Sequence, residues 1–246
     1  MPPPARHHAA LSVLLIAVGV ALFLLLKRLG GGERITIPAA FPIMAVAVLY
    51  YGVREGSLRP LGFTADHLLR DAAVGALTFV PMMLTFILLD AAFSGLLARA
   101  MDRPETVSGT LLRGLPAPWN WVAQAAYAFA LLAPAEEVVF RGLIQGRLQE
   151  SVGPVAAILI QSTIFGLAHG VPAALAWDRT LSIGYFLLGF SGGVILGSAF
   201  YLTGNSIVAP WIGHALADSP LAVLILVATG RLPQDTLHAT VGTAWP

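Results

Sequence analysis

The chain has 246 residues, of which 57% are hydrophobic and 11% are charged, with a net charge of +1 and no cysteine. Soluble domains carry roughly 25% charged residues, so these values and a mean hydropathy of +0.79 exclude an ordinary soluble domain and indicate a membrane protein with several helices. The balanced charge gives no reason to expect a nucleic-acid partner, and the lack of cysteine excludes disulfides, thiolate chemistry and cysteine-ligated metals.

Three apolar runs in the first half are long enough to span a membrane, namely Ala9–Leu26, Ile35–Val53 and Ala72–Phe93. A signal peptide is the alternative for the first run, but that run is long for one and no small-residue cleavage site follows it directly. Residues 54–71 are polar with interspersed Leu and Phe, which is typical of a loop or an interfacial amphipathic helix.

A proline-containing polar connection from Ser94 to Trp119 leads to the second half. The fourth helix is predicted over Asn120–Gln149, with a kink at Pro134. Three more apolar segments follow, at Gly153–Ala176, Leu181–Tyr201 and Ser206–Thr229.

Glycine and proline residues predict where these last segments break and where they pack closely. We expect Gly170 and Pro172 to break the fifth segment, and Pro220 to split the last one into two helices. The sixth segment contains five glycines, which favour close packing against another helix.

The predicted fold class is therefore all-α, a polytopic transmembrane bundle of seven or eight helices with an internal polar cavity. Residues 1–118 would form amino-terminal helices without catalytic motifs, residues 119–230 a motif-bearing core, and residues 231–246 a polar tail.

Charged residues are scarce in the apolar segments, so those within the fourth helix stand out. Glu136, Glu137 and Arg141 lie there, where a charge facing lipid costs several kcal/mol. Glu137 and Arg141 are four residues apart, so they share a helix face and can pair. Glu136 lies about 100° further round the helix, so its partner must come from another helix.

Histidines mark two other segments. His169 lies in the fifth segment, whereas His214 and Asp218 lie four apart, on one face, in the last. Each polar group costs energy if it is left alone in lipid, so we expect Glu136, His169, His214 and Asp218 to converge in the bundle. The alternative is that each histidine merely bonds a backbone carbonyl.

These residues form three motifs, Glu136-Glu137-x-x-x-Arg141, Phe165-x-x-x-His169 and His214-x-x-x-Asp218. Their order and spacing resemble the signature of the CAAX-protease and bacteriocin-processing (CPBP, also called Abi) intramembrane endopeptidases, which include the type II CAAX prenyl endopeptidase. The resemblance covers about Trp119 to Thr229. The third motif often ends in Asn in that family, whereas it ends in Asp218 here.

The resemblance implies hydrolysis of a peptide bond in a membrane-associated protein or peptide. Glu136, helped by His169, would be the general base that holds and deprotonates water. His214 would stabilise the oxyanion, with Asp218 either donating when protonated or orienting His214.

The same resemblance gives the remaining motif residues supporting roles. Glu137 and Arg141 would be an internal ion pair that fixes the helix around Glu136, and Phe165 belongs to the second motif beside His169.

Zinc is the alternative cofactor, because Glu136, His169 and His214 match the ligand types of catalytic zinc sites. No His-Glu-x-x-His motif is present, however, and we favour a reaction without a metal. One non-enzymatic alternative is a transporter or channel whose intramembrane acids and histidines relay protons or bind a cation. Another is a membrane scaffold or immunity-type protein that binds a partner without chemistry.

The expected partners are the membrane-associated substrate and the lipid bilayer, with no nucleic acid. Thirteen arginines against one lysine indicate a GC-rich and therefore bacterial source, so we expect an integral protein of the bacterial cell (inner) membrane. The sequence does not identify the substrate or show whether it is prenylated.

Overall fold

The computed structural model describes residues 5–29, 39–93, 95–96, 119–176 and 179–232. Within these ranges every regular element is helical, so the all-α prediction is confirmed. The predicted polar connection lies outside the described residues from residue 97 to 118, and so does the predicted tail from residue 233 onward.

The helices follow the chain in three groups. The amino-terminal group comprises α1 (Ala5–Leu29), α2 (Ala40–Leu49), its π-helical extension η1 (Tyr50–Arg54), the 3-10 turn η2 (Arg59–Leu61) and α3 (Leu68–Ala92). The central helix consists of α6 (Trp119–Tyr127), the π-helical η3 (Ala128–Leu132), α7 (Ala133–Glu137), the π-helical η4 (Val138–Gln145) and α8 (Gly146–Val152). The last group comprises α9 (Pro154–Ala176), α10 (Arg179–Leu202), α11 (Val208–Ala217) and α12 (Pro220–Ala228).

Three of the described helices, α3, α9 and α10, are long and apolar enough to cross a membrane, and the α11–α12 pair, bent by 50°, would be a fourth span. Large apolar side chains such as Leu69 and Leu77 are exposed, whereas charged Glu137 and Arg141 are buried. This distribution suits a protein surrounded by lipid. The chain is therefore a polytopic integral membrane protein.

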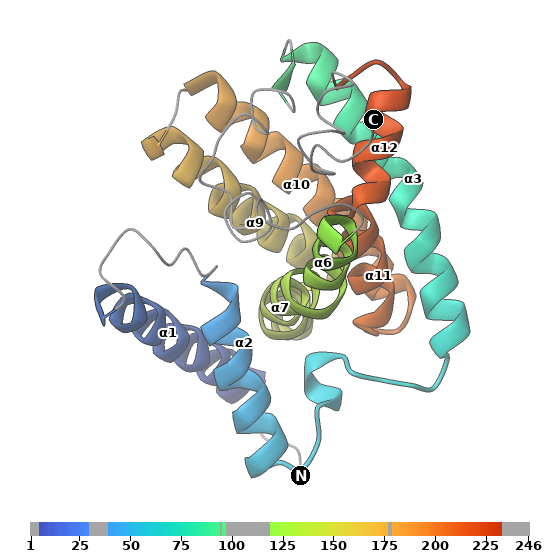
Figure 1. The fold of residues 1–246 in the computed structure, drawn as a ribbon. Helices are drawn as coiled ribbons and strands as arrows, with labels where there is room; N and C mark the ends of the chain where they lie inside the picture. The colour runs from blue at the N-terminus through green and yellow to red at the C-terminus, as the bar shows by residue number, and fades with distance from the viewer. Residues whose placement is uncertain (1–4, 30–38, 94, 97–118, 177–178, 233–246) are drawn as a thin grey trace.

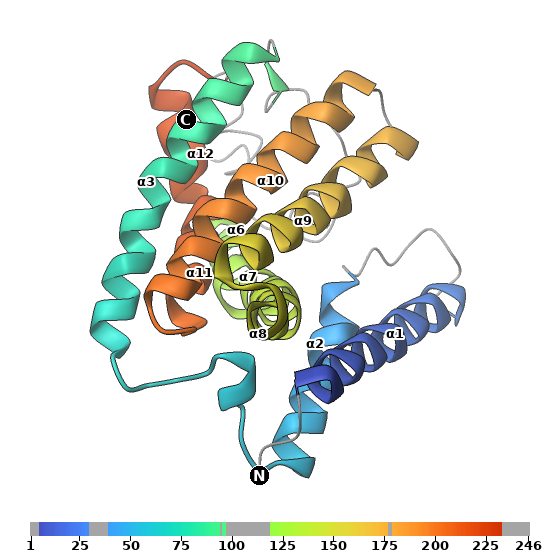
Figure 2. The same cartoon turned by 180° about the vertical axis from the view of Figure 1, so that it is seen from behind.

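The central helix lies in the middle of the bundle. Figure 1 shows it nearly end-on, with α1 and α2 on one side, α9 and α10 on another and α11 on a third, and Figure 2 shows the same arrangement from behind. Ala135 and Val138 of the central helix pack in one buried apolar cluster with Ile43 and Ala47 of α2. The amino-terminal helices thus help to build the core around the motif-bearing helix.

Small residues bring α10 close to its neighbours, as the sequence predicted. A Cβ added at Gly193 would lie 2.8 Å from the Cα of Ser162 on α9. Gln161 donates from Nε2 to the Gly193 carbonyl at 2.9 Å, and Gln145 donates from Nε2 to the Gly197 carbonyl at 2.8 Å. Close backbone approach of this kind holds transmembrane helices together, and it fixes α9, which carries His169.

The predicted break of the fifth segment at Gly170 and Pro172 is wrong, because α9 continues through both residues to Ala176. Gly170 serves close packing instead, since a Cβ there would lie 2.9 Å from the Cβ of Phe186 on α10. Its carbonyl accepts a hydrogen bond from Ser182 Oγ at 2.8 Å. Membrane helices tolerate glycine and proline where a neighbouring helix packs against them and bonds the freed backbone groups, as α10 does here.

The predicted split of the last segment at Pro220 is confirmed. Helix α11 ends at Ala217 and α12 begins at Pro220. Ser219 caps the new helix, because its Oγ accepts from the Leu221 N–H at 3.3 Å. Asp218 therefore lies at a bend between two half-helices.

Gly192 and Gly193 are neighbours on α10 and give a matched test of this packing. Alanine favours a helix at both positions, but at Gly193 its methyl group would push against the α9 backbone, whereas at Gly192 the nearest atom is Cε of Met82 at 3.8 Å. We expect Gly193→Ala to lower the free energy of unfolding by about 1–3 kcal/mol and Gly192→Ala not to lower it. Thermal unfolding in detergent would measure this, and equal stabilities would contradict the packing.

Candidate active site

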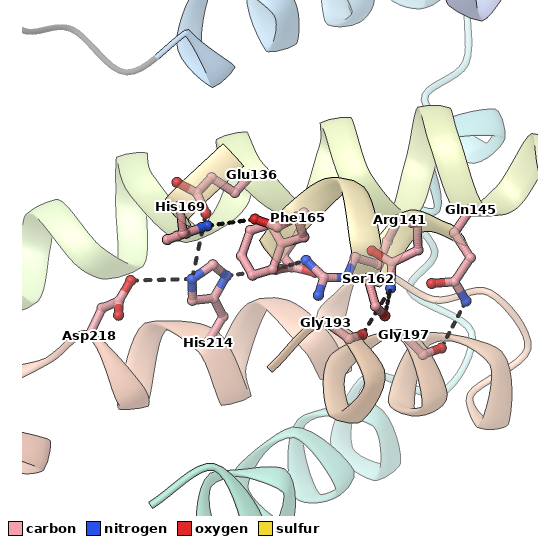
Figure 3. Close-up of polar contacts among 12 residues, drawn as sticks. Glu136, Arg141, Gln145, Ser162, Phe165, His169, Gly193, Gly197, His214 and Asp218 are labelled. Atoms are coloured by element: carbon pink, nitrogen blue, oxygen red, sulfur yellow. Dashed lines mark hydrogen bonds and ion pairs between the residues drawn. The ribbon is translucent and has the colours of Figure 1, made fainter. Parts of the chain in front are cut away.

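Four elements bring the predicted site residues together. Glu136 and Glu137 end α7, His169 lies on α9, His214 lies in the last turn of α11, and Asp218 follows α11 at the bend. Figure 3 shows these side chains gathered where the central helix, α9 and α11 meet. The expected convergence of three distant motifs is therefore present.

Glu137 is the buried centre of the cluster. Its Oε1 accepts from Arg141 Nη1 at 2.8 Å and from His214 Nδ1 at 2.6 Å, and the side chains of Glu137 and Arg141 are both 0% exposed. The predicted Glu137–Arg141 pair is confirmed. The contact with His214 was not predicted. It is compatible with the Arg141 pair, because one carboxylate oxygen can accept from two donors.

This contact sets the protonation of the His214 ring. An ionised carboxylate only accepts hydrogen bonds, so the hydrogen bond to Glu137 places a proton on Nδ1 of His214. The other ring nitrogen, Nε2, lies 3.2 Å from Asp218 Oδ2 and 3.8 Å from Glu136 Oε2. His214 therefore lies between a buried carboxylate on one side and two further carboxylates on the other.

The two carboxylates on the Nε2 side are the more accessible ones. The side chain of Glu136 is 14% exposed and that of Asp218 is 33% exposed, although Oε2 of Glu136 is itself buried, without a hydrogen-bond partner among the described residues. The cluster thus has a closed side, made by Glu137 and Arg141, and an open side, made by Glu136, Asp218 and His214 Nε2.

His169 presents one ring nitrogen to its own helix and leaves the other for the site. Its Nδ1 lies 2.8 Å from the Phe165 carbonyl, which only accepts, so Nδ1 carries the proton. In the neutral ring Nε2 is then a hydrogen-bond acceptor. Figure 3 places the ring beside the Glu136 carboxylate, and the two groups interact electrostatically.

Phe165 forms the apolar wall of the cluster. Its ring centroid lies 4.5 Å from that of His169 and 5.9 Å from that of His214. The guanidinium carbon of Arg141 lies 4.8 Å from the same centroid, a cation–π contact for a group whose Nε and Nη2 have no hydrogen-bond partner among the described residues. The second motif therefore holds both the histidine and the arginine.

The residues of the zinc alternative do not fit a metal ion in this arrangement. Within the described ranges, no group of three or more His, Asp or Glu side chains is placed so that it could hold one. His169 Nδ1 is bonded to its own helix, which leaves its Nε2 free, and Nε2 of His214 faces Asp218 and Glu136. In this arrangement the site residues are placed as hydrogen-bonding partners.

Comparison with known proteins identifies the family of the motif-bearing region. Residues 118–219 match the family model described as type II CAAX prenyl endopeptidase Rce1-like. No curated protein and no solved structure matches the chain. The matched region contains all three motifs and the buried Glu137–His214 pair, so residues 118–219 form an Rce1-like type II CAAX prenyl endopeptidase domain, and that family is a family of peptidases.

Proposed function

We propose that this protein is an intramembrane endopeptidase in which Glu136 and His169 activate a water molecule. The observation that carries the proposal is the asymmetry of the cluster. Glu136 lies on its open side beside His169, while Glu137 is fully buried behind it. A general base must reach the water that it deprotonates, and of the two adjacent glutamates only Glu136 is partly exposed.

Glu137 is unsuited to be the base. Its Oε1 already accepts from Arg141 and His214, and its side chain is 0% exposed. Taking a proton would neutralise the carboxylate and weaken both hydrogen bonds, which are charge-assisted. We assign Glu137 the role of holding His214 and Arg141.

The proposed reaction begins with a water molecule between Glu136 and Nε2 of His169. Glu136 takes one proton from this water as its oxygen forms a bond to the carbonyl carbon of the substrate. The resulting oxyanion accepts a hydrogen bond from Nε2–H of His214. Because Glu137 already holds a proton on Nδ1, this donor requires the doubly protonated ring, which the carboxylates on both sides of it favour and which Asp218 orients. The carbon–nitrogen bond then breaks, and the proton held by Glu136 passes to the leaving amine.

The substrate class follows from the location of the site and from the family. A peptidase domain acts on a protein or a peptide, and a site enclosed by apolar helices suits a substrate that is itself membrane-associated. The family name makes prenylated CAAX peptides the first substrates to test, with unprenylated peptides beside them. We assign catalysis to the core of residues 119–230 and place the protein in the bacterial inner membrane.

Glu136→Gln keeps the shape of the side chain and removes its basic carboxylate. We expect turnover to fall by roughly 10²–10⁴-fold, the usual contribution of a general base, while substrate binding persists. The measurement is cleavage of prenylated and unprenylated peptide libraries by the protein in liposomes. The matched control is Glu150→Gln on the same helix, whose side chain is 42% exposed and which should cleave like wild type.

Three results would contradict this proposal in different ways. Near wild-type cleavage by Glu136→Gln would move the base to another group. Cleavage that is lost on chelation and restored by zinc, with zinc bound to the purified protein, would favour the metal-dependent alternative. Proton or ion movement without any cleavage would favour a transporter.

His214→Ala removes the donor that we assign to the oxyanion. We expect turnover to fall on the order of 10²-fold or more. Combined with Glu136→Gln, the loss should be smaller than the product of the two single losses, because both residues act on one transition state. Losses that multiply fully in single-turnover assays would show that the two residues act independently.

Arg141→Ala leaves Glu137 buried without its cation, so we expect a loss of about 3–5 kcal/mol in stability and poor expression. The double variant Glu137→Gln/Arg141→Met removes both charges and should recover most of that stability. It should remain inactive, because His214 has lost its carboxylate. Thermal unfolding and cleavage assays of the two proteins check this, and normal stability of Arg141→Ala would refute the structural role.

A further inference from the structure

The π-helical turn before the acids leaves one backbone carbonyl without a donor in its own helix. In η3 the Ala133 N–H bonds to the Ala128 carbonyl, five residues back, so it is not directed at Phe129. The next residue, Pro134, has no N–H to offer. The Phe129 carbonyl therefore has neither the donor four residues ahead nor the one five ahead.

A tryptophan on α11 supplies the missing donor. Trp211 Nε1–H donates to the Phe129 carbonyl at 2.7 Å, across the contact between α11 and the central helix. A buried carbonyl without a partner is costly, above all in lipid. The bond therefore turns the gap created by Pro134 into a specific docking point for α11.

This docking point and the catalytic contact lie on the same pair of helices. Trp211 and His214 are three residues apart, so they lie on neighbouring positions of one face of α11. One bonds Phe129 and the other bonds Glu137, two positions of the central helix. A single contact would let α11 rotate about its axis or slide along the central helix. Two contacts fix both the rotation of α11 and its position along the central helix.

Two further contacts of α11 reach other parts of the bundle. The Ile207 N–H, just before α11, donates to the Gly62 carbonyl at 2.8 Å, and Gly213 packs against Thr78 of α3. These contacts hold α11 to the loop after α2 and to α3. The side-chain hydrogen bonds that align α11 with the central helix among the described residues are the Trp211 bond and the His214 bond, which add direction to the packing between the two helices.

We propose that Trp211 is a positioning residue of the active site, which uses the carbonyl freed by Pro134 to hold His214 at its working distance from Glu136 and Glu137. The inference rests on the proposed function. It predicts that loss of the indole N–H misplaces His214 without removing any group that touches the substrate.

The first test is Trp211→Phe, which keeps an aromatic ring and removes the N–H. A small misplacement of catalytic groups costs up to about 10²-fold, so we expect kcat to fall by roughly 10- to 100-fold with KM unchanged. Trp121→Phe on α6 is the matched control, because the Nε1 of Trp121 has no hydrogen-bond partner among the described residues. A kcat for Trp211→Phe equal to that of Trp121→Phe overturns the inference.

The second test restores a donor within the helix. Pro134→Ala gives residue 134 an N–H that can compete with Trp211 for the Phe129 carbonyl in the π-helical pattern. Pro134→Ala alone should therefore lower kcat, and Trp211→Phe should lower it little further in that background. An undiminished loss overturns the inference, because a general packing defect at Trp211 would persist whether residue 134 is proline or alanine. Should Pro134→Ala fail to fold, the kcat and KM of Trp211→Phe against Trp121→Phe decide alone.

The same assays separate this inference from the proposed function. Wild-type protein that cleaves no peptide overturns both. Wild-type cleavage that is lost in Glu136→Gln but unchanged in Trp211→Phe overturns only the positioning role.

Discussion

The structure depends on one carboxylate oxygen that accepts two hydrogen bonds in the middle of a lipid-surrounded bundle. Oε1 of Glu137 joins Arg141 of its own helix to His214 of α11, and Arg141 also lies over the Phe165 ring of α9. Removing one member of such a buried group leaves an uncompensated charge, which is why buried pairs are costly to break. Three helices that carry separate motifs are thereby held at one point.

The two adjacent glutamates have different surroundings because of helix geometry. Successive residues point about 100° apart, so Glu137 faces the arginine four residues on, while Glu136 faces α9 and the open side of the cluster. The first is fully buried and accepts two hydrogen bonds through Oε1, and the second is partly exposed beside a histidine whose Nδ1 is bonded to its own helix. Two neighbouring positions can thus carry one fully buried and one partly exposed carboxylate.

Much of this arrangement was predictable because charge is rare in membrane helices and therefore informative. The i to i+4 spacing predicted the Glu137–Arg141 pair, and the cost of isolated polar groups predicted the convergence on Glu136. Contacts between distant helices were not predictable. The hydrogen bonds from His214 to Glu137 and from Trp211 to Phe129 join residues far apart in the chain, so no spacing in the sequence indicates them. Gly170 and Pro172 were misread as a break, because their effect depends on the neighbouring α10, which satisfies and packs against the α9 backbone.

The central claim is that Glu137 holds a proton on Nδ1 of His214 and so turns Nε2 toward the reacting groups. Nitrogen NMR of ¹⁵N-histidine-labelled protein, with His214 assigned through His214→Gln, reports the protonation of each ring nitrogen directly. The account predicts a protonated Nδ1 in the resting protein, with a strongly deshielded proton whose signal changes in Glu137→Gln and stays in Glu136→Gln. An unprotonated Nδ1, or a signal that is indifferent to Glu137, would contradict it.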